Sequence, residues 1–125
     1  MGLIINNEKT SGQSLKWLGS AHASNEAQTV TLKVSAFAAF GENIPSGVPL
    51  KKDTDGLYVP VADAGDTLAG FLLTDQPARG EHQAAPMLWH GRIRVPYLPE
   101  GAFDVTTLTE VSDAFVFSNN EAVEV

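Results

Sequence analysis

The pattern of apolar residues changes near residue 28. Before this point apolar residues are scattered, and after it apolar and polar residues alternate regularly. Residues 1–28 are rich in Ser, Asn, Gly and Gln, and their large apolar side chains stand in two groups. The two groups comprise Leu3, Ile4, Ile5, Leu15, Trp17 and Leu18. Neither a helical nor a strand period is sustained, so this segment cannot form a core of its own. We therefore expect an extended N-terminal arm, residues 1–28, followed by one β-rich domain, residues 29–125.

From residue 29 onward, apolar and polar residues alternate at the period of a β-strand. In residues 29–37, Val30, Leu32, Val34 and Ala36 share one face, which predicts a half-buried strand. Residues 57–61 alternate in the same way, and Pro60 in this run lacks a ladder donor, which indicates an edge strand or a bulge. Residues 69–73, AGFLL, form a continuous apolar run typical of a fully buried strand.

The longest predicted strand covers residues 86–99. Its odd positions form an apolar face made of Met87, Trp89, Ile93, Val95 and Tyr97. Its even positions include His90, Arg92 and Arg94. Asp104 is an acceptable N-cap for a short helix through Val111, and residues 114–117 predict one more strand. Short strands separated by turns indicate a mainly β fold, either a small β-barrel (β-tulip-like) or a sandwich, with one or two short helices.

Length and composition narrow the class of protein further. A chain of 125 residues suits one domain with a single hydrophobic core. The sequence has no cysteine, which excludes disulfides, thiolate metal sites and cysteine nucleophiles. It has neither a signal peptide nor the roughly 20 consecutive apolar residues that span a bilayer. We expect a soluble protein made in the cytoplasm, with no membrane partner.

Charge is distributed unevenly along the chain, whose net charge is −7. Residues 1–52 carry five lysines and three acidic residues, whereas residues 53–125 carry three arginines and twelve acidic residues. An acidic domain argues against nucleic-acid binding, which needs cationic surface. His90, Arg92 and Arg94 nevertheless form a basic stripe within the acidic half. Two interpretations stay open: an internal ion-pair network, or a contact with an identical subunit or another protein, where arginine binds carboxylates bidentately.

The stretch DTDG, residues 53–56, invites a calcium-loop interpretation. Counted from Asp53, however, position 5 is Leu57, position 6 is Tyr58 and position 12 is Ala64. An EF-hand requires oxygen ligands at position 5, glycine at position 6 and glutamate at position 12. Asp-Gly between two apolar runs instead predicts the turn of a β-hairpin.

No arrangement of residues indicates catalysis. The three histidines are His22, His82 and His90, and their spacing, even with Glu81, matches no metal motif. No nucleophile elbow or phosphate-binding glycine loop occurs. Asp63 and Asp66 lie in a Gly/Ala-rich loop that we expect to be solvated. We therefore expect neither an enzyme nor a cofactor or metal.

Five short motifs, in order, carry a resemblance to a known family. They are WLGSAHASNEAQTVTLKVSAF, IPSGVPL, GLYVPV, LAGFLLTDQ and APMLWHGRIRVPYLP, and together they cover most of residues 17–118. The order resembles that of the head decoration proteins of tailed bacteriophages, the lambda-type decoration protein family. The resemblance implies a small β-rich domain that forms a homotrimer on the outer surface of the expanded capsid of the virion.

The resemblance also implies partners. Members of the family bind the major capsid protein and clamp neighbouring capsid subunits, and their N-terminal segment becomes ordered on the shell. The matching arm residues here are Leu3, Ile4, Ile5, Leu15, Trp17 and Leu18. An arm folded back on its own domain is the alternative.

Two other classes of protein stay open. One is an adhesive or carbohydrate-binding β-module, in which an exposed Trp17, Tyr58 or Trp89 stacks on sugars. The other is a small barrel enzyme with an unrecognised site.

Overall fold

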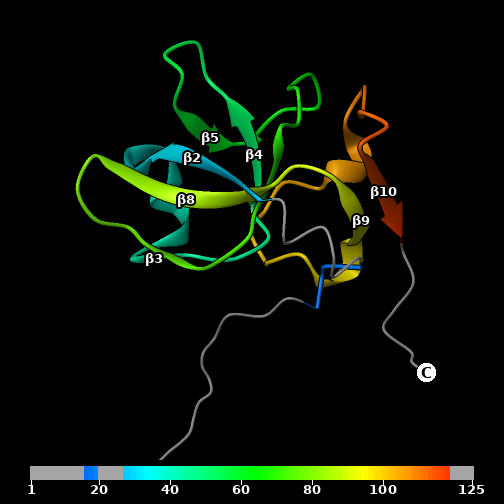
Figure 1. The fold of residues 1–125 in the computed structure, drawn as a ribbon, viewed down its shortest axis with the longest axis horizontal. Helices are drawn as coiled ribbons and strands as arrows, with labels where there is room; N and C mark the ends of the chain where they lie inside the picture. The colour runs from blue at the N-terminus through cyan, green and yellow to red at the C-terminus, as the bar shows by residue number, and fades with distance from the viewer. Residues whose placement is uncertain (1–15, 20–26, 119–125) are drawn as a thin grey trace, which may run out of the picture.

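Five strands close into a barrel in the computed structural model, which describes residues 16–19 and 27–118 (Figure 1). The barrel strands, in spatial order, are β2 (Gln28–Lys33), β5 (Tyr58–Pro60), β4 (Pro49–Lys52), β6 (Gly70–Leu72) and β8 (His82–Leu88). All neighbouring pairs are antiparallel except β2 and β5, which are parallel. The expected mainly β fold with a small barrel is confirmed.

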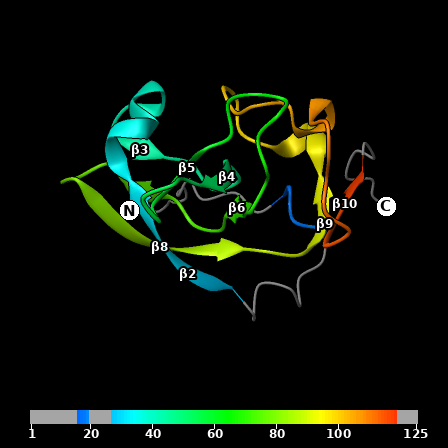
Figure 2. The same ribbon diagram turned by 90° about the horizontal axis from the view of Figure 1, so that it is seen from above.

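Two small sheets and three short helices complete the described parts of the chain. Strands β3 (Asn43–Ile44) and β7 (Gln76–Pro77) pair antiparallel, whereas β9 (Gly91–Arg94) and β10 (Phe115–Ser118) pair parallel. The helices, all of the 3-10 type, are η2 (Val34–Phe40), η3 (Val95–Tyr97) and η4 (Val105–Thr107). Helix η2 lies at one end of the barrel, and the β9–β10 sheet lies at the other (Figure 2). None of these helices is long and apolar enough to cross a membrane.

The first predicted strand is shorter than its alternation suggests. β2 ends at Lys33, and residues 34–40 form η2 instead of a continued strand. In a 3-10 helix, residues three apart share a face, so Val34 and Phe37 both turn inward while Ala36 is exposed. The prediction for Ala36 was therefore wrong, because the three-residue period replaces the two-residue period after Lys33.

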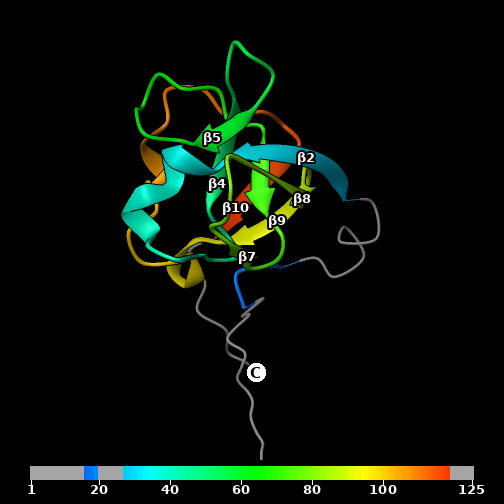
Figure 3. The same cartoon turned by 90° about the vertical axis from the view of Figure 1, so that its left-hand side faces the viewer.

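The hairpin predicted around residues 53–56 is confirmed. Strands β4 and β5 pair antiparallel, with Lys52 opposite Tyr58, and their connection projects away from the barrel (Figure 3). Gly56 has φ +85°, a conformation that glycine adopts without strain. β5 is not the open edge that Pro60 suggested, because β2 pairs with it at Tyr58. β2 and β5 pair only at Leu32 and Tyr58. Pro60, which lacks a backbone N–H, therefore interrupts no hydrogen-bond ladder on the side of β5 that faces β2.

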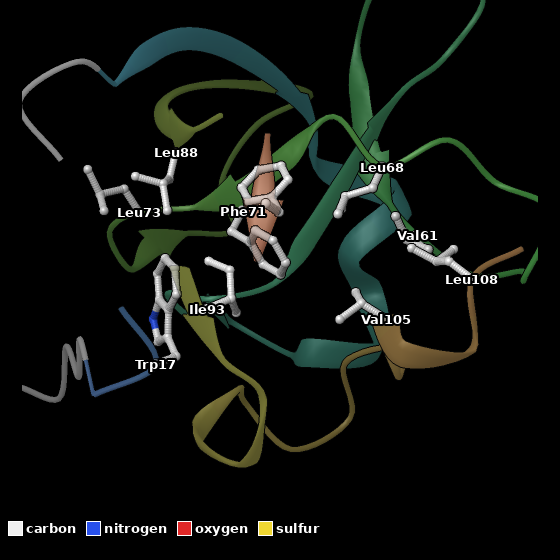
Figure 4. Close-up of a cluster of buried hydrophobic side chains, with 10 residues drawn as sticks. Trp17, Val61, Leu68, Phe71, Leu73, Leu88, Ile93, Val105 and Leu108 are labelled. Carbon is white, nitrogen blue, oxygen red and sulfur yellow. The ribbon is translucent and has the colours of Figure 1, made fainter. Parts of the chain in front are cut away.

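The interior holds two separate hydrophobic clusters. The barrel cluster consists of Val30, Leu32, Phe37, Ile44, Val48, Leu50, Leu72, Ala85 and Met87. The end cluster consists of Trp17, Val61, Leu68, Phe71, Leu73, Leu88, Ile93, Val105, Leu108 and Phe115 (Figure 4). β6 and β8 form the wall between the clusters, since Phe71 and Leu88 face one and Leu72 and Met87 face the other. This explains why residues 69–73 form an unbroken apolar run.

The long strand predicted for residues 86–99 is divided into three pieces. β8 ends at Leu88, β9 begins at Gly91 in a different sheet, and η3 follows from Val95. Gly91 has φ +129°, so the chain changes direction here and the single apolar face is lost. Trp89 is consequently 43% exposed, although the alternation placed it with the buried residues.

The C-terminal predictions hold in outline. The Asp104 carboxylate accepts a hydrogen bond from the Thr106 backbone N–H at 3.1 Å, as expected of an N-cap. The helix is only the single turn η4 and does not reach Val111. The predicted strand over residues 114–117 is confirmed as β10, one residue later.

Candidate interaction surface

Residues 16–19 are attached to the domain along the free side of β9. Leu18 forms an antiparallel bridge with Ile93. The Gly19 N–H donates to the Arg92 carbonyl at 2.8 Å, and the Arg94 N–H donates to the Trp17 carbonyl at 2.7 Å. The segment therefore acts as a short third strand beside β9 and β10.

Trp17 is a core residue of the domain. Its side chain is 1% exposed, and its ring centroid lies 5.8 Å from that of Phe71. Its Nε1–H donates to the Ser46 hydroxyl at 3.0 Å, and that hydroxyl donates to the Leu73 carbonyl at 2.8 Å. Buried indoles usually have such a partner. For residues 16–19 the geometry favours the folded-back arm over an arm that lies on a partner.

The other arm residues have different outcomes. Leu18 is half-buried and packs against the end cluster. Leu3, Ile4, Ile5 and Leu15 lie outside the described residues. The structure thus places Trp17 and Leu18 in the domain, and the roles of Leu3, Ile4, Ile5 and Leu15 remain predictions.

The basic stripe lies at the end of the molecule that carries the β9–β10 sheet. Ile93 is fully buried, and the alternation of β9 turns Arg92 and Arg94 to the opposite face, with Arg92 exposed and Arg94 half-buried. His90, half-buried, precedes the strand and its ring lies 4.2 Å from that of Trp89. Ion pairs within the described residues involve Lys33 and Lys51, and none involves Arg92 or Arg94. An internal ion-pair network around the two arginines is therefore not seen in these parts of the chain.

Val116 and Gly19 flank Arg92 on this face, and sequence reasoning missed both. Val116 stands opposite Arg92 in the register of β10 and is 51% exposed. On the other side, a Cβ atom at Gly19 would lie 2.8 Å from Cγ of Arg92, so the arginine stem packs directly on the glycine. We call Gly19, Arg92, Arg94 and Val116 the β9–β10 outer face. The alternation in Phe115-Val116-Phe117 was the available signal that Val116 points outward.

The acidic hairpin forms a closed set of interactions with one lysine. The Lys33 ammonium lies 2.9 Å from the Asp55 carboxylate and 3.4 Å from that of Asp53. The Asp55 carboxylate raises the pKa of Lys33, and the hydrogen bond from Lys33 lowers the pKa of Asp55. Backbone N–H groups of Thr54 and Leu57 also donate to these carboxylates. The carboxylates of Asp53 and Asp55 therefore interact within the hairpin and with Lys33 of the neighbouring strand β2.

Asp66 differs from the solvated carboxylate that we expected. Its side chain accepts hydrogen bonds from the backbone N–H groups of Ala62 and Asp63, at 2.9 and 3.0 Å, and pairs with Lys51 at 2.9 Å. The Ala62 N–H, followed by Lys51, lowers the pKa of Asp66. Asp66 thereby holds the loop that carries Leu68 over the end cluster.

The histidines are not brought together. His82 begins β8 and His90 follows its other end, and the six steps from His82 to Leu88 alone span about 20 Å. Glu81 lies beside His82 and so is equally distant from His90, and His22 lies outside the described residues. No group of three or more metal-ligating side chains occurs within residues 16–19 and 27–118.

No protein-family model, curated protein or solved structure matches this chain. The binding capacity of the β9–β10 outer face is therefore inferred from its own residues. Two guanidinium groups and an exposed valine on a firmly packed sheet can bind carboxylates and apolar side chains of a partner. This arrangement is suited to binding a partner.

Proposed function

We propose that this protein decorates the capsid of a tailed bacteriophage. It binds the outer surface of the expanded capsid as a homotrimer and stabilises the shell by bridging neighbouring major capsid subunits. Its action is burial of surface across subunit seams and involves no catalysis. Its place is then the virion, after synthesis in the host cytoplasm.

The ordered resemblance of residues 17–118 to the decoration proteins carries this proposal. The first motif contains Trp17, Leu18 and Gly19, which lie beside β9, and also β2. The next three motifs coincide with the β3–β4 connection, β5 and β6. The last motif contains most of β8 and all of β9. The five motifs are thus consecutive parts of one framework. They include every residue of the barrel cluster and every residue of the end cluster except Val105, Leu108 and Phe115.

The attachment of residues 16–19 supports a clamp-like role for the preceding residues. Whatever residues 1–15 contact, they join the domain at a fixed point beside β9. Leu3, Ile4 and Ile5 provide apolar side chains whose burial on a partner contributes roughly 1.5–3 kcal/mol each. Such burial across two capsid subunits opposes their separation.

Binding to capsids tests the proposal directly. Purified protein is mixed with expanded, undecorated capsids, and binding is followed by co-sedimentation and capsid melting by calorimetry. We expect saturable binding and a rise in the capsid melting temperature, because a ligand that binds only the assembled state stabilises it. Absence of binding, or binding that leaves the melting temperature unchanged, contradicts the proposal.

Two truncations separate the arm from the domain. Removing residues 2–15 should leave the domain folded and weaken capsid binding, since Leu3, Ile4 and Ile5 are lost. Removing residues 2–18 also removes Trp17 and should lower the free energy of unfolding by about 3–5 kcal/mol. Urea denaturation of both proteins measures the difference. If the protein without residues 2–15 binds capsids with full affinity, Leu3, Ile4 and Ile5 make no contact with the shell.

Trp89 supports a second candidate function, a carbohydrate-binding β-module on a virion or cell surface. Its side chain is 43% exposed, and it lies two residues before β9. Exposed aromatic rings stack on apolar faces of ligands with little loss of side-chain entropy. A glycan array tests this function, with Trp89→Ala expected to abolish any signal. An array without binding leaves capsid decoration as the remaining proposal.

A further inference from the structure

Strand β10 has one edge that no described strand covers. The Gly91 N–H donates to the Ala114 carbonyl, whereas the Arg92 carbonyl accepts from the Gly19 N–H and the Arg94 N–H donates to the Trp17 carbonyl. Backbone groups alternate between the two sides of a strand, so Gly91 and Ile93 face β10. By the register of the sheet, Val116 and Ser118 face β9 in return. The Phe115 carbonyl and both backbone groups of Phe117 therefore point to the outer edge.

This edge lacks the usual protection against strand pairing. Natural edge strands carry charges, prolines or bulges that block the addition of another strand. The sequence Phe115-Val116-Phe117 has neither charge nor proline, and its register with β9 is continuous through Ser118. The edge is also held firmly, because the rings of Phe115 and Phe117 pack edge-on against Phe71 at centroid distances of 5.2 and 6.3 Å.

The chemistry of the adjoining face specifies the strand that fits. Every second side chain of a strand added to β10 lies on the β9–β10 outer face. These side chains lie beside Val116, and long ones reach toward Arg92 and Arg94 on the next strand. Val116 favours apolar neighbours, and the two arginines favour carboxylates. The described residues provide no carboxylate ion pair for either arginine. A segment that alternates apolar and acidic side chains is complementary to this surface.

We propose that the outer edge of β10 accepts an extended acidic segment of the major capsid subunit as an added strand. The identity of the partner rests on the proposed function, whereas the β10 edge that no described strand covers and the two arginines of the adjoining face are properties of the domain itself. Main-chain hydrogen bonds to Phe117 supply affinity, and carboxylates beside Arg92 and Arg94 supply specificity. This contact is separate from the N-terminal arm. Residues 17–19 of the arm lie on one side of β9, and β10 lies on the other side.

Hydrogen exchange at Phe117 is the first test. In the free protein, the Phe117 amide should exchange much faster than those of Val116 and Ser118, which bond to β9. Exchange is then carried out on expanded capsids saturated with the protein, followed by quenching, dissociation and readout by NMR. We expect the Phe117 amide to be protected at least about tenfold more on the capsid, because a paired amide exchanges only when its bond opens.

Matched variants provide the second test. Val116→Glu places a carboxylate where the acidic strand must lie, and Val116→Thr keeps shape and β-propensity without charge. Arg92→Glu reverses the charge of the outer face, and Arg79→Glu makes the same change at an exposed loop position away from it. We expect Val116→Glu and Arg92→Glu each to weaken capsid binding about tenfold. Val116→Thr and Arg79→Glu should stay within about twofold of the wild type.

Each outcome decides a different point. If the wild type does not bind capsids, the proposed function is wrong, and so is the capsid subunit as the partner of β10. If it binds while Phe117 stays unprotected and the charged variants bind normally, the β10 inference alone is overturned. A Phe117 amide already protected in the free protein also overturns it, since residues 119–125 or a second copy then cover the edge. Sedimentation of the free protein distinguishes those two occupants.

Discussion

The barrel cluster and the end cluster are built from the same kinds of residue but in different ways. Most of the barrel cluster comes from paired strands, where alternation along β2 and β8 turns Val30, Leu32, Ala85 and Met87 inward. The end cluster is assembled from residues far apart in the chain, from Trp17 to Phe115, many of them in loops or single helical turns. Local patterning therefore suffices for one cluster and is insufficient for the other.

The difference shows where the interaction surface comes from. The barrel closes on itself, so each of its strands has neighbours on both sides. The end cluster is covered by the β9–β10 sheet and residues 16–19, and among the described residues no strand covers the outer edge of β10. A closed barrel removes strand edges, whereas a small open sheet retains them. Function is accordingly proposed at the end of the molecule where the fold is least regular.

The largest expected effect on the free energy of unfolding comes from two adjacent substitutions, one in each cluster. Phe71→Ala removes the ring at the centre of the end cluster, and Leu72→Ala removes a side chain from the barrel cluster. We expect losses of about 4 and about 3 kcal/mol in the free energy of unfolding, because both residues are fully buried. Urea denaturation measures the losses.

Exchange maps of the same two variants sharpen the comparison. Phe71→Ala should accelerate amide exchange chiefly in β9 and β10, and Leu72→Ala chiefly in β2 and β8. In a Trp89→Phe background, Trp17 fluorescence should shift to the red only for Phe71→Ala. Identical exchange maps would show that the two clusters unfold as one cooperative unit.

A smaller effect is expected at the wall between the clusters. A Cβ atom at Gly70 would lie 2.3 Å from the Leu88 carbonyl oxygen and 2.7 Å from Cγ of Met87. Gly70→Ala should therefore push β6 from β8 and destabilise the protein by about 2 kcal/mol. Gly65→Ala is the matched control, since nothing lies within 4 Å of its Cβ position. Comparable stability of the two variants would mean that β6 and β8 can separate freely.

The smallest expected effect is electrostatic and concerns Asp66, which ties the loop over the end cluster to Lys51 of the barrel. The folded-state pKa of Asp66 is lower than its unfolded value, mainly because of the Ala62 N–H. Its contribution is thus present above the unfolded pKa and disappears as pH falls through the folded pKa. Asp66→Asn should lower the free energy of unfolding by about 1 kcal/mol at pH 7.

The stability difference between wild type and Asp66→Asn should shrink on acidification below the usual aspartate range. Thermal unfolding at several pH values measures it. Asp63→Asn is the control in the same loop, because its side chain makes only a long 3.4 Å contact with the Gly65 N–H. A difference that does not change with pH would show that Asp66 acts by shape rather than by charge.

The candidate site could be predicted only in part. The alternation around Ile93 placed Arg92 and Arg94 together on an outer face, and β9 confirms that placement. The same alternation failed at Trp89, where the chain leaves the barrel for another sheet. Trp17 was grouped with the arm because a lone tryptophan in a polar segment gives no local sign of the pocket between Phe71 and Ser46 that buries it.

The sequence by itself determined the mainly β class, the hairpin at residues 53–56, the buried run at residues 69–73 and the outward direction of the two arginines. These properties depend on periods of two residues and on turn chemistry, which act over a few positions. The tertiary structure alone decided that Phe71 and Leu72 serve different clusters and that residues 16–19 belong to the domain. It also decided that β10 pairs with β9 on one side and with no other strand of the described residues. Those properties depend on which distant segments meet, and short-range patterning does not encode such pairings.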